Sequence, residues 1–187
     1  MISNFLACSK LTVDEEGGYD LNPRDRGNWT SGVVGVGTLK GTRYGISAAA
    51  YPLLDIANLT LASAQGIYMR DYFTRAGCDR LPIGVDAVVF DMAVNAGVDE
   101  GVRLLQQVVG TPQDGKCGPH TCAAANSIDP STLIRSFTAV RLAFYEATAA
   151  NNRDETEDLQ GWKNRASAVQ AAALAMAAAT STQGPTS

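Results

Sequence analysis

Residues 15–27 read EEGGYDLNPRDRG, and this stretch decides how the first part of the chain folds. Its two glycines end a first helix that we predict to stop near Glu15, and Pro23 forbids the helix from restarting nearby. Glu16 and Asp25, nine positions apart, therefore flank a segment that folds back on itself. A segment of this shape brings two carboxyl groups face to face across a cleft.

The two carboxyl groups lie in different environments. Glu16 follows the negative C-terminal end of a helix dipole, which disfavours further negative charge, and partial burial acts in the same direction. We therefore expect Glu16 to stay protonated near neutral pH and to serve as a proton donor. Asp25 lies between Arg24 and Arg26, whose charges favour a carboxylate. Such a pair suits glycosidic bond cleavage, although a surface glutamate and an ordinary Asx-turn would give the same residues.

The neighbours of this pair resemble the N-terminal signature of glycoside hydrolase family 108, the phage and bacterial N-acetylmuramidases. That signature runs roughly E-G-G-Y-x-x-x-P-x-D-x-G-G-x-T-x-x-G-I. The residues that match it in place are Glu16, Gly17, Gly18, Tyr19, Pro23, Asp25 and Gly27. Asn28 then stands where a second glycine is usual.

After Asn28 the signature is interrupted by residues 29–41, and its Thr-x-x-Gly-Ile block returns at residues 42–46. The family's threonine is Thr42 or Thr30. We assign it to Thr42 because Gly45 and Ile46 follow it and complete the Thr-x-x-Gly-Ile block. The valines and glycines of the insert predict a β-hairpin that forms one wall of a sugar-binding cleft, with a surface loop as the alternative. A glutamate, an aspartate and a hairpin threonine together resemble the catalytic triad of phage-type lysozymes.

The resemblance implies roles for two groups of residues. The catalytic group has Glu16 as general acid, with Asp25 and Thr42 opposite it as holders of the attacking water. The substrate-binding group consists of Tyr19, Tyr44 and Asn95. We place Tyr44 on the far strand of the hairpin, two residues beyond Thr42, so that both side chains project to the same side.

Asn95 belongs to an apolar helix predicted over residues 83–96, where it shares one face with Asp91. Polar groups inside so apolar a helix need partners. One interpretation is that Asn95 faces the cleft and hydrogen-bonds a sugar N-acetyl group or a catalytic carboxyl. The alternative is that both residues cap neighbouring backbone as part of the scaffold.

The rest of the chain is predicted to be helical. A first helix capped by Ser3 is predicted to end near Glu15. Periodicity, proline and glycine positions predict further helices over residues 60–75 and 98–109, from 119, over 129–149 and from 161. Residues 88–97, 114–121 and 161–165 resemble blocks of the predicted peptidoglycan-binding region that follows the catalytic segment in this family. We therefore expect a mainly α, lysozyme-like helical fold with a small β-hairpin lining the active-site cleft.

The same resemblance predicts the domain organisation. Residues 1–80 are the catalytic muramidase segment with its hairpin. Residues 81–180 are the helical peptidoglycan-binding region, packed against the first segment as one compact unit, and residues 181–187 are a loose tail.

Composition narrows the classes of partner. The 187-residue chain has a net charge of −4 and no basic stripe, which argues against nucleic acid. It lacks the run of about eighteen apolar residues that a membrane span needs. Its four cysteines and single histidine show no metal-ligand spacing, so we expect neither a metal nor another cofactor. Cys117 and Cys122 can bridge if their loop folds back, although free thiols are expected in a reducing cytoplasm.

Residues 1–10 lack a basic region followed by a full apolar stretch, so we expect synthesis in the host cytoplasm and release to the wall by another protein. The resemblance implies hydrolysis of the β-1,4 bond between N-acetylmuramic acid and N-acetylglucosamine in peptidoglycan glycan strands, by a monomeric phage endolysin or a prophage relative. Three alternatives remain: a lytic transglycosylase that uses Glu16 alone, a non-catalytic peptidoglycan-binding module, and a secretion-associated protein or delivered toxin with the same chemistry.

Overall fold

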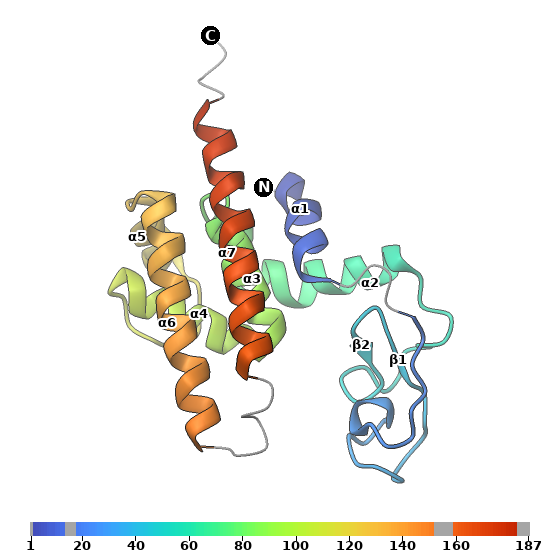
Figure 1. Ribbon diagram of the computed structural model, residues 1–187. Helices are drawn as coiled ribbons and strands as arrows, with labels where there is room; N and C mark the ends of the chain where they lie inside the picture. Colours follow the sequence, from blue (N-terminus) through green and yellow to red (C-terminus); the bar gives the residue numbers. More distant parts are fainter. Residues whose placement is uncertain (1, 14–17, 152–158, 183–187) are drawn as a thin grey trace. The chain divides into compact units, whose positions relative to one another are not determined.

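The computed structural model describes residues 2–13, 18–151 and 159–182. Its contacts divide the chain into two units (Figure 1). The helical unit consists of Met1–Thr12 and Met69–Ser187, and the loop unit consists of Val13–Tyr68. This division differs from the predicted boundary after residue 80, because the first helix packs with helices from the second half of the chain. The packing of the two predicted regions into one compact unit stays a prediction.

The helical unit is built around one buried helix, α3 (Val85–Ala96), which packs against helices from both ends of the chain (Figure 1). The remaining elements are α1 (Ile2–Thr12), η2 (Met69–Thr74), η3 (Cys78–Arg80), α4 (Val98–Val109), α5 (Pro119–Asn126), α6 (Pro130–Asn151) and α7 (Leu159–Thr182). The two long helices α6 and α7 pack along each other. All nine residues of Val85–Ala93 are buried, as a helix enclosed on every side requires.

Three phenylalanines hold the N-terminal helix to this core. The rings of Phe5, Phe73 and Phe90 meet edge to face, with centroids 5.4 to 5.9 Å apart. Edge-to-face contact adds to the burial of apolar area because the ring edge is positive and the face negative. Gly84 precedes α3 with a φ of 87°, and a Cβ there would collide with the carbonyl oxygen of Ala173 in α7. The close approach of α3 to α7 therefore requires glycine.

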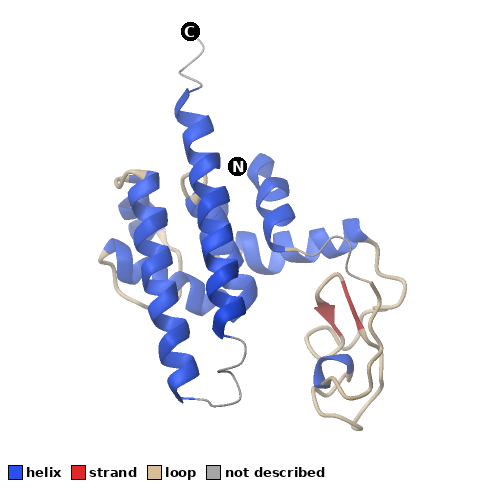
Figure 2. Cartoon of the chain, viewed as in Figure 1, coloured by secondary structure: helices blue, strands red, loops and turns tan. Residues whose placement is uncertain are grey.

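The loop unit contains little regular structure (Figure 2). A single-turn helix η1 (Arg26–Asn28), the strands β1 (Thr42–Arg43) and β2 (Ile46–Ser47), and the helix α2 (Leu61–Tyr68) are joined by turns. The two strands are antiparallel, with Thr42 opposite Ser47 and Arg43 opposite Ile46. The prediction of a mainly helical fold with a small hairpin is confirmed.

The predicted position of the hairpin is wrong. Residues 30–37 form a succession of turns, and the strands lie beyond the insert, at residues 42–47. Gly32, Gly35 and Gly37 all have positive φ, which interrupts any ladder, so only the bridge between Trp29 and Leu39 forms. The insert is therefore the surface loop that was the alternative interpretation.

The first helix also ends earlier than predicted. It ends at Thr12 rather than near Glu15, because β-branched Thr12 and Val13 weaken the last turn and Val13 lies in a bend. Arg165 of α7 donates from Nη2 to the carbonyl oxygen of Thr12 at 3.2 Å, which satisfies one of the terminal acceptors. Glu16 lies outside the described residues.

The other helix predictions are confirmed in place. α4 begins at Val98 and ends before Gly110, and α5 begins at Pro119, as predicted. The helix predicted over residues 60–75 is an α-helix to Tyr68 and a π-helix over the next six residues. Within the described ranges, we find no helix with the length and apolar character that a membrane crossing demands.

Candidate active site

Five of the six predicted site residues are described by the structure. Tyr19, Asp25, Thr42 and Tyr44 belong to the loop unit, and Asn95 belongs to the helical unit. The predicted approach of Asn95 to Tyr44 across a cleft joins the two units and stays a prediction. The geometry below is therefore that of each unit by itself.

Asn28 is the centre of a hydrogen-bond network in the loop unit. Its side chain is fully buried, and its Nδ2 donates to Asp20 Oδ2 at 2.7 Å and to the carbonyl oxygen of Asn22 at 3.1 Å. Its Oδ1 accepts from Thr42 Oγ1 at 2.7 Å. Asn28 thus fixes the loop of residues 20–28 against strand β1. We did not predict this role, although an asparagine in place of the usual glycine was the visible signal.

The bond to Asn28 determines what Thr42 can do chemically. A hydroxyl has one proton and two lone pairs, and Thr42 gives its proton to Asn28. The free side of Thr42 Oγ1 can therefore only accept hydrogen bonds. The backbone of Thr42 is fixed as well, since its N–H and C=O pair with Asp20 at 2.9 Å each.

Asp25 caps the single-turn helix η1. Its Oδ1 accepts from the backbone N–H of Gly27 at 2.8 Å, which leaves Oδ2 without a partner among the described residues. Asp25 and Ser47 line one open hollow of about 540 Å³, here called the Asp25 hollow. Ser47 lies opposite Thr42 in the hairpin, and side chains in such a pair are direct neighbours. Ser47 thus lies both on the wall of the Asp25 hollow and opposite Thr42 in the hairpin, and the sequence pattern did not identify it.

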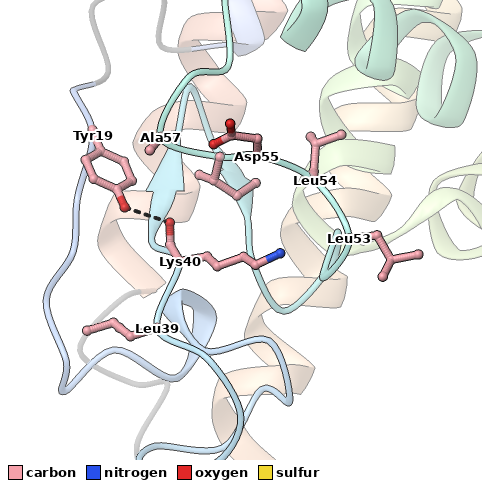
Figure 3. Close-up of a pocket in the computed structure, with 8 residues that line it drawn as sticks. Tyr19, Leu39, Lys40, Leu53, Leu54, Asp55 and Ala57 are labelled. Carbon is pink, nitrogen blue, oxygen red and sulfur yellow. Dashed lines mark hydrogen bonds between the residues drawn. The ribbon is translucent and has the colours of Figure 1, made fainter.

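Tyr19 lines a groove of about 280 Å³, here called the Tyr19 groove (Figure 3). Its hydroxyl donates to the carbonyl oxygen of Lys40 at 2.9 Å, and the Lys40 Nζ donates to the carbonyl oxygen of Pro52 at 2.7 Å. Leu53, which also lines the groove, has 97% of its surface exposed. The Tyr19 ring, held by its hydroxyl on one side of the groove, is a surface on which a sugar ring can pack, and Leu53 lies on the opposite side (Figure 3).

The predicted placement of Tyr44 is wrong. Tyr44 and Gly45 form the two-residue turn of the hairpin, with φ values of 52° and 74°, as a type I′ turn requires. Tyr44 is therefore on neither strand, and the reason given for its projecting to the same side as Thr42 does not hold. Its carbonyl oxygen accepts from the Tyr68 hydroxyl at 3.0 Å, and the Arg43 guanidinium lies 5.3 Å from its ring centroid.

Asn95 is exposed, and its partner is a side chain rather than backbone. Its Oδ1 accepts from the Tyr145 hydroxyl at 2.6 Å, and Tyr145 in turn accepts from Arg141 Nε at 2.7 Å. Asp91, on the same helix, accepts a hydrogen bond from Arg141 on Oδ2 and one from Arg165 on Oδ1. Asp91 and Asn95 are thus bonded by side chains of α6 and α7, so the alternative in which these two residues cap backbone is wrong.

Comparison with known proteins matches two consecutive parts of the chain to two family models. Residues 9–97 match the model described as glycosyl hydrolase 108, and residues 100–167 match the model described as predicted peptidoglycan domain. The structure of SagA from Brucella abortus is similar, with a TM-score of 0.76 and 29% sequence identity over 95% of this chain and 97% of that chain. No curated protein gives a match.

Residues 9–97 form a glycosyl hydrolase 108 segment, and the predicted peptidoglycan domain follows it at residues 100–167. The fold is lysozyme-like, as the resemblance implied. The first match ends at residue 97, directly after α3, and the second begins at residue 100 in the first turn of α4. Asn95 therefore belongs to the hydrolase region, while Tyr145 and Trp162 belong to the second. Together these matches support a glycoside hydrolase that acts on peptidoglycan.

Proposed function

We propose that the protein is an N-acetylmuramidase that hydrolyses the β-1,4 bond between N-acetylmuramic acid and N-acetylglucosamine. Glu16 is the general acid that protonates the leaving sugar oxygen. The proposal is supported by the position of Glu16 inside the matched region 9–97, directly before the glycine pair of the signature. General acid catalysis contributes roughly 10²–10⁴-fold in rate.

The observation that carries the rest of the mechanism is the hydrogen bond from Thr42 to Asn28. Because Thr42 can only accept, and because Asp25 keeps one oxygen free, two acceptors are available to hold one water molecule by its two protons. The water oxygen then attacks the anomeric carbon as Glu16 gives its proton to the leaving group. Asp25 takes the proton that the water loses, so one water is consumed for each bond broken.

The hydrogen bond of Thr30, the other candidate for the family's threonine, supports the assignment to Thr42. Thr30 Oγ1 accepts from the backbone N–H of Thr38 at 2.9 Å within the insert. The hydroxyl of Thr30 thus holds the two ends of a surface loop together, whereas that of Thr42 belongs to the network around Asn28.

Two other functions predict different products. A lytic transglycosylase would use Glu16 alone and leave anhydro-sugar ends, so it would need neither Asp25 nor Thr42. A non-catalytic module would bind glycan and cleave nothing, as the second family match alone would allow. Mass spectrometry of digested peptidoglycan separates the three, because hydrolysis adds water and leaves a reducing N-acetylmuramic acid end.

The decisive experiment compares the natural chain with Glu16→Gln on purified peptidoglycan. We expect reducing muropeptides from the natural chain and almost none from the variant, while both melt at the same temperature. Anhydro products would assign the protein to the transglycosylases. Equal digestion by a folded Glu16→Gln chain would remove Glu16 from the mechanism.

We further propose that the protein acts as a monomeric endolysin, made in the host cytoplasm and released to the wall by another protein. Expression in a bacterial cytoplasm should then leave cells intact until the membrane is permeabilised. Lysis without permeabilisation would contradict this setting, and a delivered toxin would instead act when supplied from outside the membrane.

A further inference from the structure

We propose that a pocket in the helical unit binds one N-acetylglucosamine unit of the glycan strand, with the amide of Asn95 as the hydrogen-bond donor. The Asn95 pocket has a volume of about 240 Å³ and is lined by Asn95, Ala96, Phe144, Tyr145, Thr148 and Trp162. The ligand class rests on the proposed function, which supplies the glycan. The site itself rests on the contacts described below.

A buried relay fixes the orientation of the Asn95 amide. Asp91 and Arg141 are 0% and 1% exposed, and Arg141 donates to Asp91 at 2.6 Å. Tyr145 accepts from Arg141 Nε, so its own proton is free to be donated, and Asn95 Oδ1 at 2.6 Å is a stronger acceptor than the thioether of Met92 at 3.7 Å. Asn95 Oδ1 is therefore held as an acceptor.

The consequence is that Asn95 presents a donor to the pocket. Its Nδ2 has no partner among the described residues, and turning the amide over would replace the short bond from Tyr145 to Asn95 Oδ1 with a contact between the hydroxyl and an NH₂ group. A fixed amide donor on the rim of a pocket selects a ligand that carries a carbonyl oxygen. The N-acetyl group of an amino sugar provides one.

The walls of the pocket favour the apolar face of a sugar. The rings of Tyr145 and Trp162 lie 5.3 Å apart with an interplanar angle of 39°, and Trp162 is half-buried. Flat aromatic surfaces with little side-chain entropy are suited to ring ligands. Pockets that bind drug-sized ligands have volumes of roughly 300–1,000 Å³, so a pocket slightly below this range has room for a single sugar ring.

The charge of the lining decides between the two sugars of peptidoglycan. None of the six lining residues is charged, and Arg141 is committed to Asp91 beneath the pocket. A carboxylate brought to such a surface would lose its hydration without gaining a counter-charge. N-acetylmuramic acid, whose lactyl group carries a peptide with free carboxylates, is therefore disfavoured, and the neutral N-acetylglucosamine is selected.

The test uses the full chain carrying Glu16→Gln, so that the ligand stays intact. The protein has two tryptophans, and the indole N–H signals of Trp29 and Trp162 can be told apart by NMR with a Trp29→Phe variant. On titration with a tetramer of β-1,4-linked N-acetylglucosamine, we expect the Trp162 signal to shift. A glucose tetramer with the same linkage lacks the N-acetyl group and should leave it in place.

Asn95→Asp sharpens the test, because it keeps an acceptor for Tyr145, removes the donor and adds one negative charge that a control can match. Loss of one hydrogen bond should weaken the Trp162 response roughly three- to tenfold. The matched control is Asn164→Asp on α7, which adds the same charge where an asparagine oxygen accepts from Gln160 at 2.9 Å outside the pocket. The control should bind as the parent does.

Two outcomes overturn the inference. One is that the Trp162 signal does not shift when the N-acetylglucosamine tetramer is added, and the other is that Asn95→Asp and Asn164→Asp bind the tetramer equally. These outcomes are separate from failure of the proposed function. If the natural chain releases no muropeptides from peptidoglycan but the tetramer still binds at Trp162, the proposed sugar site stands and the proposed muramidase activity is wrong.

Discussion

Asp91 of α3 and Arg141 of α6 form an ion pair of 2.6 Å that is almost wholly removed from water, with side chains 0% and 1% exposed. Arg165 of α7 approaches the other oxygen of Asp91 at 2.7 Å and also reaches the carbonyl oxygen of Thr12 at the end of α1. One carboxylate therefore connects four helices. A cation at the C-terminal end of α1 also complements the helix dipole.

The first prediction concerns removal of this carboxylate. Asp91→Ala leaves Arg141 buried without a counter-charge, and breaking a buried pair in this way costs roughly 3–5 kcal/mol. Urea unfolding should show the loss as a lower midpoint. The control is Glu146→Gln, whose partner Lys163 lies 2.7 Å away on the surface, where such pairs contribute about 0–1 kcal/mol. Equal midpoints for the two variants would contradict the central role of Asp91.

How far the fold can be read from the sequence depends on whether the signal is local. α3 and α4 were predictable because Gly97 and Gly110 end them and their apolar positions recur with helical spacing. The need of Asp91 for a partner was also predictable. That the partner is Arg141, fifty residues further on, depends on how the helices pack, which local pattern does not encode.

The loop unit departs further from prediction for the same reason. The valines of the insert favour strand individually, but glycines at positive φ prevent the ladder, so the hairpin forms where Tyr44-Gly45 supplies a two-residue turn. Thr42 could be selected from the signature. Its partner Asn28 could not, since asparagine was a departure from the usual glycine and its contacts come from strand β1.

The second prediction concerns Asn28 as a positioning residue. Asn28→Ala removes the acceptor that holds the Thr42 hydroxyl and the donor that holds Asp20. A catalytic group displaced by about 1 Å can cost on the order of 10²-fold in rate, so we expect kcat to fall by up to that factor with little change in KM. Kinetics on soluble peptidoglycan fragments would measure both quantities.

A reciprocal exchange serves as the control. In the double variant Asn28→Asp with Asp20→Asn, residue 28 still accepts from Thr42 and the amide and carboxylate that face each other are interchanged, while the bond from residue 28 to the Asn22 carbonyl oxygen is lost. This chain should recover more kcat than Asn28→Ala. A folded Asn28→Ala chain with unchanged kcat would show that Thr42 needs no orientation.

The third prediction concerns the thiols. All four cysteines are buried and free, and burial is the largest cause that raises the pKa of Cys117 to about 12. The pKa values of Cys8 and Cys78 are also raised by burial. Since the thiolate is the reactive form, a disulfide reagent at pH 8 should label the native chain slowly and the urea-unfolded chain at once.

Cys117 and Cys122 provide an internal check on this chemistry. Their sulfurs lie 3.3 Å apart, so a first modification of either would be followed by closure to a disulfide within the chain. Mass spectrometry after slow oxidation should find this pair joined before any other. Rapid labelling of native chain at all four positions would contradict the buried environment.

The fourth prediction concerns the pH dependence of stability. Burial raises the pKa of Asp86 above its ordinary 3.8, although Asn4 and the backbone N–H groups of Gly84 and Ala87 donate to the carboxylate. The folded state therefore holds the proton more tightly than the unfolded state. Stability from this group is fully present below 3.8 and falls as pH rises through the folded pKa.

Asp86→Asn removes that titration. Relative to the natural chain, the variant should gain in melting temperature between pH 3 and pH 7, because only the natural chain must ionise a buried carboxyl in this range. The comparison isolates Asp86 from all other acids, which both chains share. A melting-temperature difference that is constant with pH would mean that Asp86 titrates alike in both states.

The last prediction concerns stereochemistry. A water held between Asp25 and Thr42 attacks from the face opposite Glu16, which inverts the anomeric centre and gives the α-anomer first. Inverting enzymes hold their two carboxyl groups roughly 6.5–9.5 Å apart, against about 5–5.5 Å for retaining enzymes. The separation of Glu16 and Asp25 stays a prediction, since Glu16 lies outside the described residues. NMR of the first product decides the matter: release of the β-anomer would rule out inversion and make Asp25 a nucleophile. Thr42→Ala should slow cleavage of the glycosidic bond strongly if the enzyme inverts, because the attacking water is then needed in that step. If the enzyme retains configuration, the same step needs no water and should be slowed less.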